Sequence, residues 1–292
     1  MMKKQEILDE DWDNLIILDA CRYDYFKKVY KKFLEGKLEK RWSRGSSTAS
    51  WCCKTFTDYL DVFYFSSNPF INSRNIRLKE LVSKGEEKWW IKKRIKGFDF
   101  NWNPTNHFKK VLDIWHNCWD KETNTVLPED VNKIVLKSRH KNKRKIIHYL
   151  QPHQPYLSIK RSNLNKKPKK SRSNKAKKIT KKTRFYLGPL IKSVNRKKQW
   201  KIKKYFGIGS LNMMQNLVVN NKIDTLKTLY SENLKIVLRN VSSLVNNLDG
   251  KTIVTADHGE AFGENGEWAH EYGSVSPVLR TVPWLKVNNI KK

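Results

Sequence analysis

The chain has 292 residues, of which 38% are hydrophobic and 12% aromatic, and this is enough apolar material for a packed core. The composition therefore excludes a globally disordered protein, and the length fits one large domain over residues 1–292. The 60 lysines and arginines outnumber the 28 acidic residues and give a net charge of +32, which on its own suggests a nucleic-acid-binding protein.

Apolar runs and amphipathic stretches alternate along the chain. The patterns predict buried strands at residues 14–18, 61–65, 145–150 and 253–256. They predict helices at residues 22–34, 48–59, 128–137 and 222–247. This alternation is typical of an α/β fold with a mainly parallel central sheet and helices on both of its faces.

Much of the positive charge lies in one segment, residues 160–204, which contains 20 lysines and arginines and no acidic residue. Residues 160–182 have almost no apolar side chains, so they cannot bury enough surface to offset the entropy of ordering. We therefore expect a flexible basic insertion. Its role stays open between a solvated surface, a contact to a polyanionic glycan or an anionic membrane surface, and a contact to nucleic acid.

The four cysteines show neither C-x-x-C spacing nor the regular ladder of a secreted disulfide scaffold. This usage fits a reduced compartment, so we expect a cytoplasmic location. The first residues are charged, and no apolar run approaches the roughly 18 residues that a membrane helix needs. The sequence thus predicts neither a signal peptide nor a transmembrane segment.

Residues 252–270, T-I-V-T-A-D-H-G-E-A-F-G-E-N-G-E-W-A-H, form the most informative motif. The predicted strand ends just before Asp257 and His258, and ligands of open α/β sheets bind beyond the carboxyl ends of strands. A carboxylate oxygen and an imidazole nitrogen are also ligands that Zn²⁺ and Mn²⁺ accept. Taken alone, the Asp-His pair would also fit a surface or helix-capping position.

The longer string, with D-H-G-E followed by G-E-N-G and then by His270, resembles the alkaline phosphatase/sulfatase superfamily. Its spacing is most similar to that of phosphoethanolamine transferases and lipoteichoic acid synthases. The resemblance implies an alkaline phosphatase-like fold, one or two divalent metal ions (zinc or manganese), and Asp257 and His258 as metal ligands. It also implies that His270 contacts the transferred phosphoryl group or a second metal. Members of that branch are usually membrane-anchored, and this sequence shows no such anchor.

Asp19 follows the first predicted strand in the string L-D-A-C-R-Y-D. An aspartate before a helix can cap it by accepting hydrogen bonds from free backbone N–H groups. Superfamily members place a metal-binding acidic residue at the end of their first strand, so the resemblance implies that Asp19 is a further metal ligand.

Residues 44–51, R-G-S-S-T-A-S-W, precede a predicted helix. They fit either a hydroxyl-rich cap or a nucleophile at a helix N-terminus, where the oriented N–H groups favour a phosphoryl oxygen. The string G-S-S-T-A is similar to the G-T-x-T-A of phosphoethanolamine transferases, which implies Thr48 as the nucleophile. A second register, with a serine three residues after the nucleophile, implies Ser47. We prefer Thr48 and keep Ser47 as the alternative.

His153 lies in the string P-H-Q-P-Y after the third predicted strand. This string is similar to the substrate-binding histidine segment of sulfatase-like proteins, which implies that His153 contacts the leaving group or a phosphoryl oxygen. A histidine near a strand end is otherwise more often structural, and we expect His148, inside the strand, to pack or to orient a neighbour.

Together, these residues imply a metal-dependent phosphoester hydrolase or phosphoryl transferase that acts on an anionic phosphate ester, with a glycan or a lipid as one candidate carrier of the substrate. The main type of sulfatase needs a C/S-x-P-x-R string, which the chain lacks, so hydrolysis of a sulfate ester is a weaker alternative. A nucleotide phosphodiesterase and a non-catalytic member that binds polyanions or nucleic acid are further alternatives.

Overall fold

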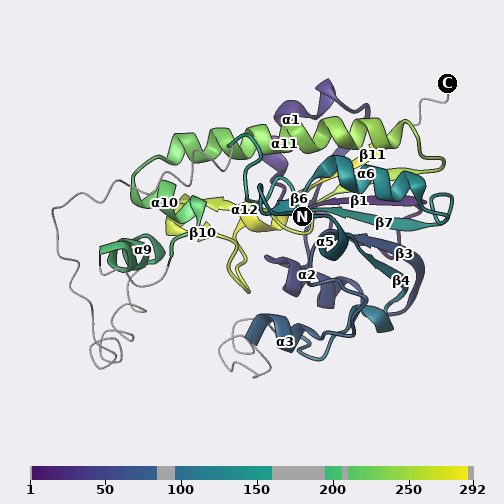
Figure 1. Ribbon diagram of the computed structural model, residues 1–292, viewed down its shortest axis with the longest axis horizontal. Coiled ribbons are helices and arrows are strands. Elements are labelled where there is room, and N and C mark those ends of the chain that lie inside the picture. The colour runs from purple at the N-terminus through teal and green to yellow at the C-terminus, as the bar shows by residue number, and fades with distance from the viewer. Residues whose placement is uncertain (1, 84–95, 160–194, 206–209, 289–292) are drawn as a thin grey trace.

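A seven-stranded sheet forms the centre of the computed structural model, which describes residues 2–83, 96–159, 195–205 and 210–288 (Figure 1). The strand order is β2-β11-β8-β1-β7-β3-β4. The strands are β1 (Asn14–Leu18), β2 (Gly36–Trp42), β3 (Leu60–Ser66), β4 (Phe108–Asp113), β7 (Lys145–Tyr149), β8 (Thr252–Thr255) and β11 (Thr281–Val287). All pairings from β8 to β4 are parallel, while β11 runs antiparallel to both β8 and β2. The predicted mainly parallel sheet is confirmed.

The helices are α1 (Tyr23–Val29), α2 (Thr48–Thr55), α3 (Leu78–Ser83), α5 (Ile114–Asn117), α6 (Pro128–Lys137), α9 (Arg196–Tyr205), α10 (Met213–Val219), α11 (Ile223–Val245) and α12 (Pro277–Arg280). Single 3-10 turns span Tyr30–Lys32, Pro104–Asn106 and Glu264–Gly266. Two small hairpins consist of β5 (Trp119–Asp120) with β6 (Thr125–Val126), and of β9 (Ala261–Phe262) with β10 (Trp268–Ala269).

Helices cover both faces of the sheet, as the sequence predicts. Successive side chains of a strand point to opposite faces. In β1, Ile16 and Leu18 therefore join a core with α1, α6 and α11, while Leu15 and Ile17 join a second core with α2 and α3. Figure 1 shows α1, α6 and α11 on one side of the sheet and α2 and α3 on the other.

The sequence predicted the buried strands better than the peripheral ones. The predictions at 14–18, 61–65, 145–150 and 253–256 correspond to β1, β3, β7 and β8, whereas β2, β4 and β11 were not predicted. The edge strand β2 has the polar sequence G-K-L-E-K-R-W, and β11 carries Pro283, so neither has a continuous apolar pattern. The helix predicted at 22–34 is shorter, because α1 ends at Val29 and a 3-10 turn follows.

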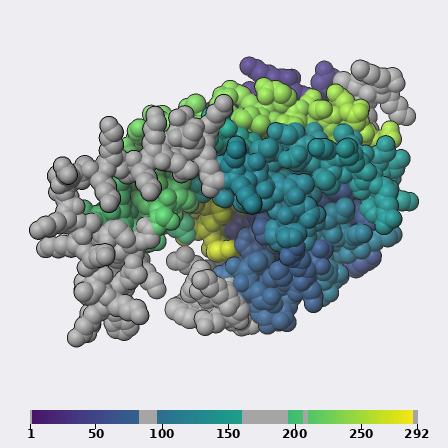
Figure 2. Space-filling model, in the orientation of Figure 1, coloured from purple at the N-terminus to yellow at the C-terminus, as the bar shows by residue number. Residues whose placement is uncertain are grey.

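A third apolar cluster lies beside the main cores. It joins α9, α10, the first half of α11 and the β9–β10 hairpin through side chains that include Trp200, Met214, Tyr230, Phe262 and Trp268. In Figure 2 the yellow C-terminal part of the chain is visible between the green α9–α10 region and the blue α2–α3 region. Residues 195–204 of the basic segment thus belong to a packed region. Residues 160–194 lie outside the described residues, and the flexible insertion stays a prediction there.

Candidate active site

The carboxyl ends of neighbouring parallel strands bring the predicted residues together. Asp19 follows β1, and Asp257 and His258 follow β8, the strand paired with β1. All three side chains are buried, with exposed fractions of 3%, 0% and 0%. Because the strands are parallel, these residues meet at one edge of the sheet, where α/β proteins place their ligands.

The hydroxyl of Thr48 points into this group of residues. Thr48 is the first residue of α2, and its Oγ1 donates a hydrogen bond of 2.7 Å to Asp257 Oδ2 and lies 3.4 Å from His258 Nε2. Ser47 is instead the N-cap of α2. Its Oγ accepts a hydrogen bond from the backbone N–H of Ser50 and lies 2.9 Å from Ser50 Oγ. The two hydroxyls that sequence analysis left as alternatives therefore have different surroundings.

Backbone contacts orient Asp257 and His258. Asp257 Oδ1 accepts hydrogen bonds from the N–H groups of Ala20 (3.0 Å) and His258 (2.8 Å), which leaves Oδ2 facing Thr48. His258 Nδ1 lies 2.8 Å from the carbonyl oxygen of Gly259, which can only accept, so Nδ1 carries the proton. The unprotonated Nε2 then faces Asp257 Oδ2 at 3.3 Å and Asp19 Oδ1 at 3.7 Å.

This arrangement gathers negative charge, and no lysine or arginine of the described residues balances it. Burial and the charge of Asp257 raise the pKa of Asp19 well above its ordinary value, and burial lowers the pKa of His258. Within the described parts of the chain, neither Asp19 nor Asp257 forms an ion pair with a lysine or an arginine. Two carboxylates and an imidazole lone pair that face one another repel unless a cation lies between them, so this donor set fits a divalent metal ion.

His148 adds a second indication of this kind. Its Nδ1 lies 2.9 Å from the hydroxyl of Tyr64, and this contact fixes the orientation of the ring. Its Nε2 lies 3.9 Å from Asp19 Oδ2 and, although buried, has no hydrogen-bond partner. With Asp19 and Asp257, His148 could place three donor atoms within 4.8 Å of one another.

Asn68 is a site residue that sequence analysis missed. It follows β3, and its Nδ2 donates a 2.7 Å hydrogen bond to Asp19 Oδ2 and lies 3.4 Å from Thr48 Oγ1. Its position just beyond the carboxyl end of a predicted strand was the signal available in the sequence, but an asparagine in S-S-N-P is also typical of a simple turn.

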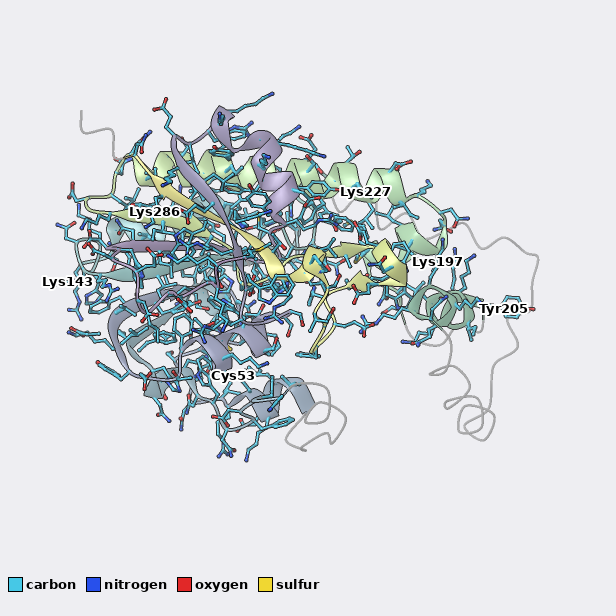
Figure 3. All side chains as sticks on the ribbon, turned by 180° about the vertical axis from the view of Figure 1, so that it is seen from behind. Cys53, Lys143, Lys197, Tyr205, Lys227 and Lys286 are labelled. Atoms are coloured by element: carbon cyan, nitrogen blue, oxygen red, sulfur yellow. The ribbon has the colours of Figure 1, made fainter. Side chains whose placement is uncertain are left out.

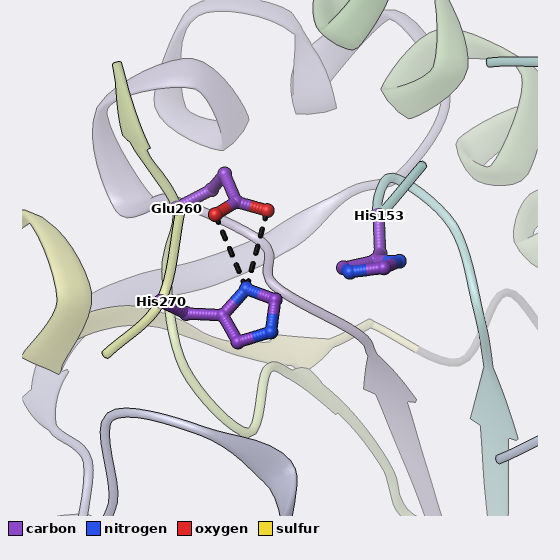
Figure 4. A group of neighbouring side chains, drawn as sticks. All are labelled: His153, Glu260 and His270. Atoms are coloured by element: carbon purple, nitrogen blue, oxygen red, sulfur yellow. Dashed lines mark hydrogen bonds and ion pairs between the residues drawn. The ribbon is translucent and has the colours of Figure 1, made fainter. Parts of the chain in front are cut away.

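Figure 4 shows a second group of possible metal ligands, which consists of His153, Glu260 and His270. Glu260 Oε1 lies 3.1 Å from His270 Nδ1. The centre of the His270 ring is 4.7 Å from that of His258, a member of the first group, and 5.2 Å from that of His153. Burial opposes protonation of His270, but the charge and hydrogen bond of Glu260 outweigh it and raise its pKa. The sequence predicted the two histidines; the structure adds the buried Glu260.

The loop that carries His153 is fixed by Asn233 of α11, a second residue that sequence analysis missed. The buried Asn233 Nδ2 donates to the carbonyl oxygens of Pro152 (3.2 Å), His153 (3.0 Å) and Pro155 (3.2 Å). The backbone N–H of His153 in turn donates to the carbonyl oxygen of Asp19 at 3.1 Å. The position of His153 is therefore tied to both α11 and β1.

A cavity of about 330 Å³, the active-site cavity, opens onto these residues and is lined by Thr48, His153, His270, Arg196 and Trp200, among others. Arg196 and Trp200 belong to α9. Arg196 forms an ion pair with Glu271, and Trp200 packs against Trp268, with their ring centres 6.3 Å apart. Figure 3 shows α9, with Lys197 and Tyr205 labelled, at the end of the molecule opposite Lys143 and Lys286. The described part of the basic segment thus forms one wall of the cavity.

No family model matches the chain, and no curated protein matches it. Several solved structures are similar. The soluble domain of lipooligosaccharide phosphoethanolamine transferase A from Neisseria meningitidis is 12% identical, with a TM-score of 0.43 over 98% of this chain and 79% of that one. A phosphonate monoester hydrolase from Silicibacter pomeroyi is 14% identical, with a TM-score of 0.42 over 94% and 67%. A zinc complex of the C-terminal periplasmic domain of EptC from Escherichia coli is 11% identical, with a TM-score of 0.39 over 98% and 75%.

These comparisons overturn the expected cytoplasmic location, since the similar structures include C-terminal periplasmic domains. The cysteines were a weak guide because Cys21, Cys52 and Cys53 are buried free thiols, and a buried thiol can stay unpaired without a reducing compartment. Over the described residues, no helix combines the length and the apolar character needed to cross a bilayer. At identities of 11–14% the likeness to these structures concerns the fold alone.

Proposed function

We propose that the protein is a metal-dependent phosphoester hydrolase or phosphoryl transferase in which Thr48 is the nucleophile. The observation that carries this proposal is the position of the Thr48 hydroxyl. This hydroxyl is buried at the first turn of α2, hydrogen-bonded to Asp257 and adjacent to His258, and Thr48 lines the active-site cavity. A hydroxyl is a weak nucleophile at neutral pH and needs such an activating environment.

Asp19, Asp257 and His258 would hold one divalent ion, zinc or manganese, because they supply the oxygen and nitrogen donors that these metals accept. A bound metal of this kind lowers the pKa of an adjacent hydroxyl and polarises a phosphoryl oxygen. His153, Glu260 and His270 could hold a second ion, since one donor atom from each lies within 4.8 Å of the others.

The chain's own residues account for the remaining steps. Thr48 Oγ1 would form a bond to phosphorus as the bond from phosphorus to the leaving oxygen breaks, and Asp257 Oδ2 is placed to accept the hydroxyl proton. The backbone N–H groups at the start of α2 favour the charge on the phosphoryl oxygens, apart from that of Ser50, which donates to Ser47 Oγ. Where no second ion is bound, His270, whose pKa is raised, would donate a proton to the leaving oxygen, with His153 beside it. Water or an alcohol would then release the phosphoryl group from Thr48.

Arg196 and His270 line the same cavity, which supports an anionic phosphate ester as the substrate. Glu260 and Glu271 partly balance these two groups, so the site would favour an ester of modest charge. Hydrolysis and transfer differ only in whether water or another alcohol reacts with the phosphorylated Thr48.

Turnover of three p-nitrophenyl compounds, a phosphomonoester, a phosphodiester and a sulfate ester, tests the proposal, with zinc or manganese added and Asp257→Asn as the control. We expect cleavage of a phosphoester that depends on the metal and is lost in the variant. Cleavage of the sulfate ester alone would overturn the argument for phosphoryl chemistry. Absence of both turnover and bound metal would favour a non-catalytic polyanion-binding protein.

A further inference from the structure

A second cavity, of about 450 Å³, lies outside the candidate active site and shares no lining residue with the active-site cavity. Its charged lining residues are all basic: Lys4, Arg44, Lys54, Lys96 and Arg280. We call it the basic pocket. Cys53 of α2, labelled in Figure 3, also lines it, together with Trp42 and Ser43.

The five basic side chains have no acidic partner among the residues that the structure describes. None of them forms an ion pair with an acid in the described ranges, although Lys3 and Arg41 nearby both pair with Glu10. Asp99 lies close enough to Cys53 to interact with its thiol, but Asp99 does not line the basic pocket. The high lysine content of the chain explains basic residues on the surface, but it does not explain five that converge on one cavity without an acid among them.

Two of these cations, Lys54 and Arg280, are half-buried, and a half-buried positive charge without an acidic partner is unfavourable. Burial lowers the pKa of Lys54, with the charge of Arg280 adding to the effect, and burial also lowers the pKa of Arg280. Partly desolvated positive groups that repel each other are stabilised when an anion binds between them.

Arg280 is also held in position before any ligand binds. Its Nε donates a 2.7 Å hydrogen bond to the carbonyl oxygen of Ser43, and its guanidinium lies 5.2 Å from the centre of the Trp42 ring. The backbone N–H of Ser43 donates to the carbonyl oxygen of Arg280 at 2.7 Å. A guanidinium fixed in this way loses little conformational entropy when it binds an oxyanion.

We propose that the basic pocket binds a ligand with a diphosphate group. A single phosphate, with a charge of about −2 at neutral pH, would balance less than half of five positive charges, whereas a diphosphate brings about −3 to −4. The pocket volume of about 450 Å³ also exceeds what one phosphate group needs. This proposal does not depend on the catalytic role of Thr48.

Calorimetric titration of the purified full-length chain tests this site. The probe is methylenediphosphonate, which resists hydrolysis, with methylphosphonate as the matched ligand carrying one anionic group. We expect methylenediphosphonate to bind at least about tenfold more tightly. Lys54→Gln and Lys96→Gln should each weaken its binding about fivefold or more. Lys96 is exposed, so its replacement should not disturb folding.

Lys40→Gln is the matched control. Lys40 is an exposed lysine of β2 outside the basic pocket, and its replacement removes the same charge as the replacement of Lys54 or Lys96. Lys40→Gln should change the affinity for methylenediphosphonate less than twofold. Equal weakening of binding by Lys40→Gln and Lys54→Gln would show a general attraction of the anion to a basic protein and would overturn the proposal. Asp257→Asn should bind the probe as the wild type does. Loss of binding in that variant would place the anion at the metal site and would also overturn it.

Discussion

Thr48 Oγ1 lies 2.7 Å from Asp257 Oδ2, so the first residue of α2 is hydrogen-bonded to a residue just beyond β8, 209 positions away in the chain. Both side chains are buried, with exposed fractions of 6% and 0%. A helix from one face of the sheet thus delivers a hydroxyl to the carboxyl edge of two central strands. The chemistry that we propose requires this distance to be kept.

Replacement of Thr48 should remove turnover without unfolding the protein. Thr48→Ala is expected to lower kcat on the preferred phosphoester by on the order of a thousandfold or more, because no other residue would accept the phosphoryl group. Thr48→Ser keeps a hydroxyl and should retain part of the activity. Steady-state kinetics and a test for a phosphorylated residue measure both effects.

Ser47→Ala is the control for this prediction, since Ser47 caps α2. It should cost about 1 kcal/mol of stability and leave kcat within a few fold of the wild type. The opposite pattern, with activity lost in Ser47→Ala and kept in Thr48→Ala, would make Ser47 the nucleophile.

Replacement of Asp19 should have opposite effects on the metal-free and the metal-bound protein. Burial and Asp257 raise the pKa of Asp19 above that of the unfolded chain, so its charged form is destabilising at neutral pH. Without metal, Asp19→Asn should therefore raise the melting temperature, and the gain should shrink as the pH falls toward the unfolded pKa. With zinc, the wild type should be stabilised and the variant should not.

Differential scanning fluorimetry with and without added zinc, supported by elemental analysis of bound metal, measures this reversal. Asp24→Asn is a suitable control, because Asp24 pairs with Arg22 away from the cluster and its side chain is 52% exposed. If Asp19→Asn bound zinc as tightly as the wild type, Asp19 would not be a ligand.

Replacement of Asn233 should disturb His153 from a distance. Asn233→Ala would leave buried carbonyl groups of the 152–155 loop without a donor, which should cost about 1–3 kcal/mol and let His153 move. We expect kcat to fall while the affinity for the ion that Asp19, Asp257 and His258 would hold changes little. Asn240→Ala, on the same helix, is the matched control, because its side chain donates within α11, to the carbonyl oxygen of Ile236.

Urea unfolding, kinetics and zinc titration separate these effects. Unchanged kcat in a folded Asn233→Ala protein would show that α11 supports the loop without positioning His153. Equal loss of metal affinity and of kcat would instead indicate a general disturbance of the site.

Most residues named from the sequence lie in a short string beside a buried strand or a helix start, and the resemblance of these strings to a known family implied their roles. Asp257, His258 and Thr48 could be named in this way, as could the four central strands, whose apolar runs reflect burial on both faces. The edge strand β2 could not, because its polar side chains follow no such pattern.

Asn68, Glu260 and Asn233 escaped prediction for a different reason. Asn68 reaches Asp19 across 49 residues of chain, and Asn233 reaches His153 across 80. Glu260 was visible in the D-H-G-E string, but its contact with His270 depends on the turn between them. Such contacts follow from the three-dimensional arrangement of elements and leave no local signal in one sequence.

Glu10 should make the stability of the fold depend on pH at its amino-terminal edge. Its carboxylate accepts hydrogen bonds from Arg41 (3.0 Å), Lys3 (3.3 Å) and Lys286 (2.8 Å), and Arg41 is almost fully buried. Burial opposes ionisation of Glu10, but the hydrogen bonds from Lys286 and Lys3 and the charges of Lys286 and Arg41 outweigh it and lower the pKa to about 2. Since this folded-state pKa is below the ordinary value of 4.5, the stabilisation is complete above pH 4.5 and is lost as the pH falls toward 2.

Glu10→Gln should therefore cost about 1–3 kcal/mol at pH 7 and distinctly less at pH 3, as measured by urea unfolding. Asp11→Asn, which breaks an exposed pair with Lys251, should change stability little at either pH. A pH-independent difference between Glu10→Gln and the wild type would mean that packing, and not the charge of Glu10, accounts for its effect.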